Sequence, residues 1–149
     1  MTFSQTCTIP VGRERLWDFL MDVPRVTQCL PGLEKVEGVG QDSYQGTFKV
    51  KVGPIRLALE GKVTVEERRR EAWQAALRAD AADRRLGGGI RARARMTLTA
   101  AGDGATALTV ETDLTVLGKI GEFGQPVIKK KADALLQEFA ANIRTALSL

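Results

Sequence analysis

Histidine is absent from the 149 residues of this chain, and cysteine occurs only at Cys7 and Cys29. The lack of histidine removes the commonest general base and the commonest metal ligand at neutral pH, so Ser–His and Cys–His nucleophilic pairs are excluded. The two cysteines form neither a disulfide framework nor a CxxC pair, and the scattered carboxylates lack metal-ligand spacing. We therefore expect no metal, no cofactor and no enzymatic activity.

Aromatic residues are also scarce, and the excess of positive charge is small. The chain has five Phe, two Trp and one Tyr, with 22 basic against 18 acidic side chains and a net charge of +4. Nucleic-acid binding needs a concentrated basic stripe interleaved with aromatic residues, so we expect no nucleic-acid partner. The mild positive charge would suit an anionic membrane surface or an acidic protein equally well.

Long hydrophobic runs are missing as well. No stretch approaches the roughly 18 apolar residues that span a bilayer. The first residues, MTFSQTCTIP, have neither the basic start nor the apolar block of a signal peptide. Together with the low cysteine content, this favours a reducing cytoplasm. No linker or internal repeat divides the chain, and we expect a single domain over residues 1–149.

Alternation of apolar and polar residues is clearest over Ser43–Glu66, on both sides of Gly53-Pro54. Period two over this length predicts antiparallel strands with one wet face and one covered face. If Gly53-Pro54 is a two-residue connection, the register places Gly46 opposite Gly61. Paired strand glycines mark a sharp bend, which suits a sheet that curls into a cup.

The remaining segments supply the other elements of the fold. Apolar residues from Lys119 onward fall at three- and four-residue steps, which predicts a long amphipathic helix whose firm part starts near Pro126. The other expected elements are a strand over Thr2–Ile9, helices over Arg13–Met21 and from Asp22 through Cys29, and strands over Leu33–Val39, Glu71–Ala81, Ile90–Thr99 and Leu108–Val116. This order predicts an α+β helix-grip fold: a curved seven-stranded antiparallel sheet around a long C-terminal helix, with two short helices after the first strand.

Small inward residues raise the question of what fills the cup. By parity, Ala75 and Ala79 on one strand and Ala92 and Ala94 on the next face inward. Protein interiors pack at near-crystal density, so these positions must be matched by bulk from the helix or leave a void. We favour a ligand cavity. A fully packed core, in which small residues admit the helix closely, is the alternative.

The walls of such a cavity are expected from inward apolar side chains, with a few polar groups that orient the ligand. The predicted wall consists of Trp17, Leu30, Phe48, Val50, Leu59, Trp73, Ala92, Ala94, Met96, Leu114, Phe123 and Val127. The polar candidates are Tyr44 and Thr112, which are inward by parity. Each of these side chains would equally suit plain core packing or a satisfied position near a rim.

Basic residues gather at the hairpin tip, where Lys49, Lys51 and Arg56 lie together and Lys51 faces Arg56 in the expected register. Like charges opposite each other cost stability, so the tip is a candidate contact for an anionic partner or lipid headgroups. A solvated tip is the alternative. The arginines of Ile90–Thr99 face carboxylates of the following strand, and cross-strand ion pairs explain them. Lys129–Lys131 is expected on the exposed face of the long helix, and a membrane-facing role is the alternative.

Four segments, in this order and spacing, carry a family resemblance. They are Ile9-Pro10-Val11 with Leu16-Trp17, then Cys29-Leu30-Pro31-Gly32-Leu33, then Phe48–Ile55 with Glu60-Gly61-Lys62, and then Gly118-Lys119-Ile120 with Gly124 beyond. Together they cover nearly the whole chain, which resembles the carbon monoxide dehydrogenase G-subunit family within the large START and Bet v 1-like (SRPBCC) superfamily. Longer relatives carry a C-terminal tail that can anchor them to a membrane. This chain stops at Leu149, so the resemblance does not carry over that anchor.

The resemblance implies a cupped pocket for an apolar molecule, quinone-like or lipid-like. It also implies service to a molybdenum hydroxylase such as carbon monoxide dehydrogenase, in membrane recruitment, maturation or electron hand-off to quinone. On this reading the chain is a non-catalytic binding protein, cytoplasmic or peripheral at the inner face of the membrane, with a movable lid near Cys29–Leu33. Two alternatives stay open: a polyketide cyclase-like or dehydratase-like enzyme that uses Tyr44, and a protein-interaction module with a filled core.

Overall fold

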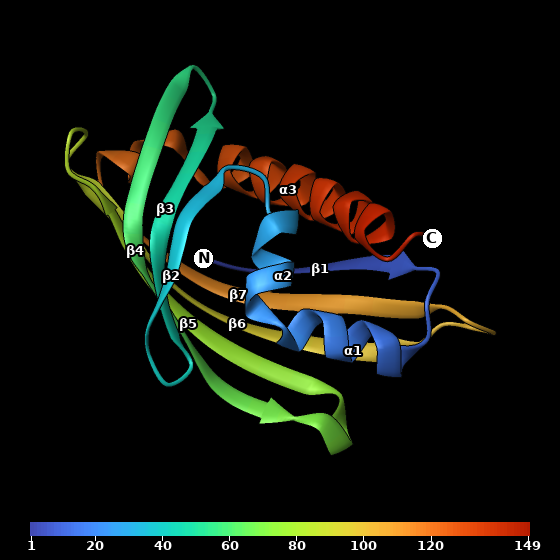
Figure 1. The fold of residues 1–149 in the computed structure, drawn as a ribbon. Helices are drawn as coiled ribbons and strands as arrows, with labels where there is room; N and C mark the ends of the chain where they lie inside the picture. The colour runs from blue at the N-terminus through green and yellow to red at the C-terminus, as the bar shows by residue number, and fades with distance from the viewer.

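The structure, a computed structural model, describes residues 1–149 as one seven-stranded antiparallel sheet with a long C-terminal helix (Figure 1). Across the sheet the strands follow the order β1-β7-β6-β5-β4-β3-β2. The strands are β1 (Thr2–Ile9), β2 (Leu33–Gly40), β3 (Ser43–Val52), β4 (Ile55–Arg69), β5 (Gln74–Asp83), β6 (Gly88–Ala100) and β7 (Thr106–Gly118). The helices are α1 (Arg13–Met21), α2 (Val23–Val26) and α3 (Gln125–Ala146), and short 3-10 turns are η1 (Thr27–Cys29), η2 (Arg70–Ala72) and η3 (Lys119–Phe123).

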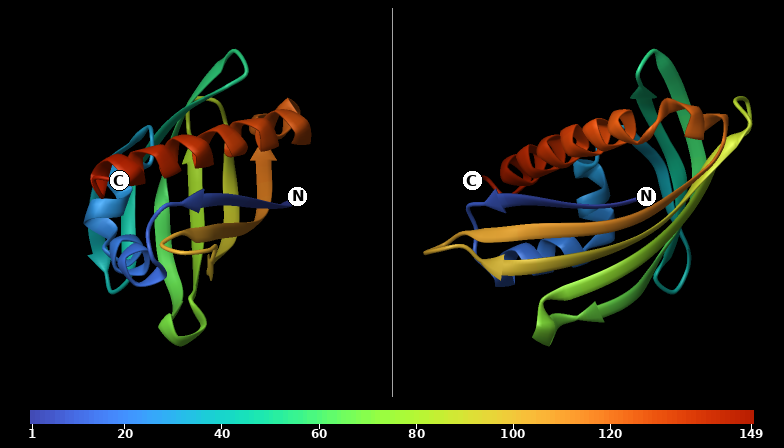
Figure 2. Two further views of the ribbon diagram at one scale, coloured as in Figure 1. Left: turned by 90° about the vertical axis from the view of Figure 1, so that its right-hand side faces the viewer. Right: turned by 180° about the vertical axis from the view of Figure 1, so that it is seen from behind.

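The sheet curves into a cup, and α3 lies across its concave side (Figure 2). Helix α1 packs against β6, and a hydrogen bond from Arg15 to the carbonyl of Leu147 joins α1 to the end of α3. This arrangement confirms the predicted α+β helix-grip fold. The predicted helix Arg13–Met21 is confirmed, and α3 begins one residue before Pro126. Proline suits that first turn because its φ is fixed and no hydrogen bond to its nitrogen is needed.

The hairpin of β3 and β4 has the predicted two-residue turn. Gly53 adopts a φ of 58°, in the left-handed region that glycine enters without steric cost. Further along the hairpin, Gly46 pairs with Gly61, as predicted. At Gly61 the backbone of β5 comes so close that a Cβ atom would overlap the carbonyl oxygen of Asp80. The bend expected from the glycine pair therefore brings β4 and β5 into close contact at this point.

The sequence predicted a strand over Glu71–Ala81, and this prediction was wrong for the first residues. Arg70–Ala72 forms η2, Trp73 has a left-handed φ of 56°, and β5 begins at Gln74. This geometry turns the ring of Trp73 back toward α1, where it meets Trp17 edge to face with ring centroids 6.2 Å apart. The packing of the two rings overrides the local alternation, which therefore gave no warning of the turn.

Buried apolar side chains form two separate clusters at opposite ends of the cup. The larger cluster, core 1, joins α1, the sheet and the C-terminal half of α3, and the smaller cluster, core 2, lies under the β3–β4 hairpin and η3. Core 1 comprises Cys7, Ile9, Val11, Leu16, Trp17, Phe19, Leu20, Cys29, Ala75, Leu98, Leu108, Ala140, Ile143 and Leu147. Core 2 comprises Val52, Leu57, Leu59 and Ile120.

A buried carboxylate, Asp83, lies beside core 2 and is only 2% exposed. It accepts hydrogen bonds from the backbone N–H of Ala58 at 2.9 Å and of Leu86 at 3.0 Å. These two hydrogen bonds, with a smaller contribution from the charge of Arg85, outweigh desolvation and lower the pKa of Asp83 below its ordinary value. The carboxylate therefore ties β4 to the turn between β5 and β6.

The glycine pair gives a test of the bend. Replacing Gly61 by Ala should lower the free energy of unfolding by about 1–3 kcal/mol, because the new methyl group would overlap the β5 backbone. At Gly46 a methyl group would meet its nearest atom, the carbonyl oxygen of Glu34, at 3.2 Å, so Gly46→Ala should cost much less. Urea unfolding of both variants measures the difference, and equal stability of the two would contradict the close approach at Gly61.

Asp83 should make stability depend on pH. Because its pKa is lower in the folded state than its unfolded value of about 3.9, the carboxylate stabilises the fold above that pH. This contribution is lost as the pH falls through the folded-state pKa. Asp83→Asn should cost about 1–3 kcal/mol at pH 7, because one backbone N–H then faces an amide NH₂ group.

Denaturant unfolding between pH 7 and pH 3 measures this effect, and the loss of stability on acidification should be smaller in Asp83→Asn than in the unchanged protein. The matched control is Asp80→Asn. Asp80 makes a surface ion pair with Arg91 at 3.4 Å, which is worth about 1 kcal/mol or less. If the two variants lose the same stability at pH 7, the role assigned to Asp83 is wrong.

Candidate ligand-binding cup

Between core 1 and core 2, the concave face of the sheet carries side chains that belong to neither cluster. They form two cross-strand rows, because residues paired across neighbouring strands point to the same face. One row consists of Val65, Leu77, Ala94, Thr112 and Phe3. The other row consists of Tyr44, Val63, Ala79, Ala92 and Leu114. We call these two rows the belt.

Most side chains of the belt remain accessible. Val63 and Leu77 are each 37% exposed, although both are apolar and face inward. Ala92 and Ala94 are half-buried, and Leu114 is the buried member of the belt. Small alanine side chains add little bulk to this part of the concave face. The middle of the cup is therefore an apolar surface without full cover.

Helix α3 does not fill the space over the belt. Of its 22 residues, Ala140 and Ile143 are buried, and both lie in the C-terminal half that joins core 1. Val127, in the first turn, is 40% exposed, and Leu135 is half-buried. An accessible apolar belt facing a partly covered helix is an arrangement that can enclose a hydrophobic ligand.

The residues predicted to line the cup fall into groups. Those in the belt are Tyr44, Ala92, Ala94, Thr112 and Leu114. Those in core 1 or packed against it are Trp17, Trp73 and Met96, and those in core 2 or packed against it are Phe48, Val50, Leu59 and Phe123. Leu30 and Val127 belong to neither cluster. The belt residues have the most accessible positions for a ligand, and contact with a ligand stays a prediction for all of them.

The two tryptophans close the core 1 end of the cup. Trp17 is 4% exposed, and its partner Trp73 lies between two guanidinium groups, of Arg13 at 4.6 Å and Arg70 at 5.6 Å from the ring centroid. Arg70 also pairs with Asp18 of α1 at 3.0 Å. These cation–π and ionic contacts attach η2 to α1 and hold the aromatic pair in place.

The predicted wall omits Val63, Leu77 and Ala79, which the structure places in the belt. Alternation in the sequence already placed these three residues on the inner face, so the sequence contained the information needed to include them in the wall. The sequence did not reveal which inward positions α3 leaves uncovered, because that depends on the path of the helix across the cup.

The segment Cys29–Leu33, expected to act as a lid, is attached at two points. The side chain of Asn142 donates a hydrogen bond to the carbonyl of Cys29 at 2.8 Å, and the N–H of Lys49 donates to the carbonyl of Gly32 at 2.8 Å. Gly32 has a φ of 86°, and a Cβ atom there would overlap the Lys49 carbonyl. The segment therefore bridges α3 and β3, and any opening must break these contacts.

The basic hairpin tip differs in part from the prediction. Lys51 lies opposite Arg56, as expected, but Lys49 pairs with Glu34 at 2.9 Å. Arg85, from the turn between β5 and β6, donates a hydrogen bond to the carbonyl of Arg56 at 2.7 Å. The basic tip therefore consists of Lys51, Arg56 and Arg85. Sequence reasoning missed Arg85 because it lies far along the chain from the hairpin.

The arginines of β6 lie in the predicted register, with Arg93 opposite Asp113 and Arg95 opposite Glu111. The ion pair that forms is a different one, because Arg95 lies 3.6 Å from Glu67 of β4. These charged side chains and four belt residues, Phe3, Leu77, Ala94 and Thr112, line a hollow of about 740 Å³. By the alternation of each strand, the charged side chains point to the face opposite the belt.

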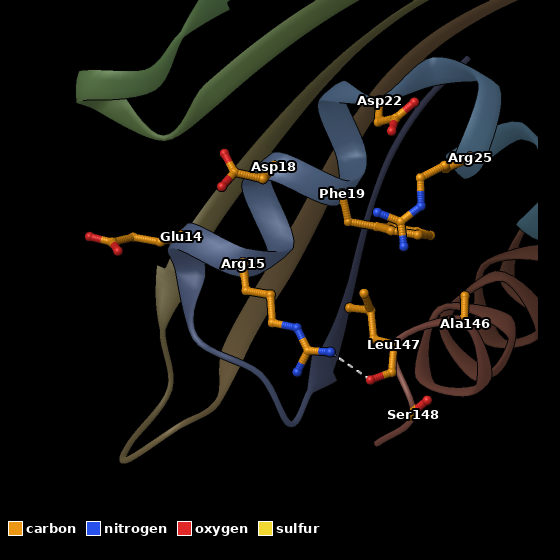
Figure 3. A pocket seen from close by; sticks show the side chains of 9 residues that line it. All are labelled: Glu14, Arg15, Asp18, Phe19, Asp22, Arg25, Ala146, Leu147 and Ser148. Atoms are coloured by element: carbon orange, nitrogen blue, oxygen red, sulfur yellow. Dashed lines mark hydrogen bonds between the residues drawn. The ribbon is translucent and has the colours of Figure 1, made fainter.

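Another surface hollow, of about 720 Å³, lies between α1 and the C-terminal end of α3 (Figure 3). The guanidinium of Arg25 lies 4.8 Å from the ring centroid of Phe19, and Arg15 donates a hydrogen bond to the Leu147 carbonyl at 2.7 Å. The lining residues are Glu14, Arg15, Asp18, Phe19, Asp22, Arg25, Ala146, Leu147 and Ser148. Charged groups dominate this lining, so the hollow does not suit an apolar ligand.

Both cysteines are free and buried. Burial raises the pKa of the Cys7 and Cys29 thiols, against the opposing charges of Arg144 and Arg25 respectively, so both thiols are poor nucleophiles. No group of three or more cysteine and carboxylate side chains is placed to hold a metal ion. No helix of the chain is both long enough and apolar enough to cross a membrane.

Similar folds occur among solved structures. A conserved protein of Geobacillus kaustophilus has a TM-score of 0.89 at 20% identity, over 99% of this chain and 95% of that one. A START superfamily protein of Mycobacterium smegmatis has a TM-score of 0.68 at 14% identity, over 99% and 97% of the two chains. The ZhuI aromatase/cyclase of Streptomyces sp. R1128 has a TM-score of 0.64 at 16% identity, over 98% and 95%. At these identities the likeness concerns the fold.

No curated protein matches the sequence significantly. A family profile matches almost the entire chain, from residue 6 to residue 148, and its family is that of the carbon monoxide dehydrogenase G subunit, CoxG. The match agrees with the resemblance seen in the sequence and with the START-type neighbours of the fold. The chain belongs to the CoxG family of carbon monoxide dehydrogenase proteins.

Proposed function

We propose that this protein is a non-catalytic carrier that holds an apolar small molecule, quinone-like or lipid-like, against the belt of its cup. The observation that supports this most directly is the separation of the two cores. Val63 and Leu77 face inward, yet each keeps 37% of its surface exposed. A protein with a filled core would cover such side chains, because burial of apolar surface is the main favourable term in folding.

Binding would proceed by partition of the ligand from water or lipid into the cup. Each Å² of apolar surface removed from water is worth roughly 25 cal/mol, so a ligand that covers the belt gains affinity without any charged contact. Tyr44 and Thr112 supply hydroxyl groups at opposite sides of the belt for orientation. The segment Cys29–Leu33, attached to α3 and β3, is the proposed lid.

The partner that we propose is a molybdenum hydroxylase of the carbon monoxide dehydrogenase type. This follows from membership of the family, whose name refers to that enzyme. The protein would serve it in membrane recruitment, maturation or electron hand-off to quinone, as a cytoplasmic protein that is peripheral at the inner face of the membrane. The basic tip of Lys51, Arg56 and Arg85 is the proposed contact with anionic headgroups or an acidic partner surface. Lys49 contributes less positive charge to this contact, because it forms an ion pair with Glu34.

Filling the belt should abolish ligand binding. Ala92→Phe or Ala94→Phe places a large ring over the middle of the cup, and we expect at least a tenfold loss of affinity for decylubiquinone and for oleoyl lysophosphatidylcholine. Native mass spectrometry after organic extraction and reloading measures the bound fraction, and thermal unfolding checks the fold. Ala82→Phe, on the exposed outer face of β5, is the matched control and should bind like the unchanged protein. A folded Ala94→Phe variant with unchanged binding would rule out this site.

A second candidate function is a cyclase-like or dehydratase-like activity. Tyr44 is an ionisable residue in the belt, and the neighbouring folds include an aromatase/cyclase. Under this alternative, Tyr44→Phe should abolish turnover of a polyketide-like substrate while ligand binding persists. Under the carrier proposal, the same variant should lose no more than about tenfold in affinity, the worth of one hydrogen bond. Assays of turnover and binding on the same Tyr44→Phe preparation separate the two functions.

A further inference from the structure

The three consecutive lysines of α3 lie in different environments. Lys130 is exposed, and Lys129 contacts the Asp133 carboxylate at 3.2 Å and the Phe3 ring at 5.9 Å. Lys131 is half-buried and makes neither a hydrogen bond nor an ion pair. The expectation that all three lie on the exposed face is therefore wrong for Lys129 and Lys131, which are both half-buried. A lysine can cover its aliphatic stem while its ammonium group stays accessible, and no buried side-chain nitrogen in this structure lacks a partner. The ammonium group of Lys131 is therefore accessible and without an ionic partner.

The position of Lys131 on the helix follows from its spacing to Asn142. The two residues are 11 positions apart, about three turns, so they lie on the same side of α3 and roughly 16 Å apart along its axis. Asn142 donates a hydrogen bond to the carbonyl of Cys29 in η1, so this side faces the lid segment and the β2–β3 edge of the cup. Half-buried Leu135 lies between them on the same side. The spacing therefore puts Lys131 on the side of α3 that faces the lid segment, and we call the space between this side of α3 and β3 the mouth of the cup.

The strands across this mouth do not neutralise Lys131. Glu34 of β2 pairs with Lys49 at 2.9 Å, and Glu37 accepts a hydrogen bond from Gln45 at 2.7 Å. The residues of β3 that face inward by parity are apolar, apart from Tyr44. The mouth thus combines the unpaired Lys131 with inward apolar residues of β3.

We propose that the ligand of this cup is an amphipathic molecule with a carboxylate or similarly anionic head, and that Lys131 binds this head while the tail covers the belt. This inference rests on the proposed carrier function and specifies the class of its ligand. An ammonium group binds an anionic head by a charge-assisted hydrogen bond, which is stronger than a neutral one. Each row of the belt crosses five neighbouring strands, about 19 Å at the usual strand spacing, which gives room for a medium-length alkyl tail.

Lauric acid and dodecanol test this, because they share a tail and differ in the head. Isothermal titration calorimetry, below the concentrations at which either probe self-associates, should show laurate bound about tenfold more tightly than dodecanol by the unchanged protein. Lys131→Met should remove this preference and leave dodecanol affinity nearly unchanged, because the aliphatic part of the side chain is kept. Lys131→Arg should restore the preference, because a cation is again present.

The matched control is Lys130→Met, which removes the same charge from the exposed neighbour and should keep the preference for laurate. If the unchanged protein binds both probes equally, or if Lys131→Met keeps the preference, the headgroup role is wrong and the carrier function stands. If Lys130→Met and Lys131→Met lose the preference equally, general charge attraction explains it and Lys131 has no special role. If neither probe binds, the inference is overturned; failure of Ala94→Phe to change quinone or lysophospholipid binding would separately overturn the cup as the carrier site.

Discussion

A single helix has to cover the whole concave face of a seven-stranded sheet, and the rest of the structure depends on how little of that face it covers. Helix α3 packs tightly only in its C-terminal half, where Ala140 and Ile143 join core 1. At the other end of the cup, η3 and the hairpin make a second core of their own. Buried apolar contacts are therefore concentrated at the two ends of the cup, and the belt between them stays partly exposed. The arrangement separates the residues that stabilise the fold from those that we propose bind a ligand.

Polar contacts also lie at the two ends of the cup and around the belt. Asp83 joins β4 to the β5–β6 turn at the core 2 end, and the pair of Trp17 and Trp73 with its arginines joins η2 to α1 at the core 1 end. Hydrogen bonds from Asn142 and Lys49 hold the lid segment between helix and sheet. Each contact fixes part of the frame around the belt. A cup framed in this way can keep its shape with or without a ligand, which lowers the cost of ordering on binding.

Much of the fold was predictable, because alternation of apolar and polar residues shows where the strands are and which face each side chain takes. Alternation with period two predicted the hairpin register with Gly46 opposite Gly61 and the inward positions of Ala92 and Ala94. The turn at Trp73 was not predictable, because long-range aromatic packing decides it. For the same reason, neither the exposure of Leu77 nor the position of Lys131 could be foreseen. Alternation says which face a side chain takes, whereas the cover over that face is set by residues far away in the chain.

The separation of the belt from both cores has a consequence for how such proteins evolve. A substitution in a packed core usually costs stability, which limits the changes that selection can accept. Belt residues contribute to neither core, so their size and polarity can change with little effect on the fold. One frame can then be adapted to different ligands by drift at a few inner positions. A START superfamily protein and an aromatase/cyclase have the same architecture at 14% and 16% identity.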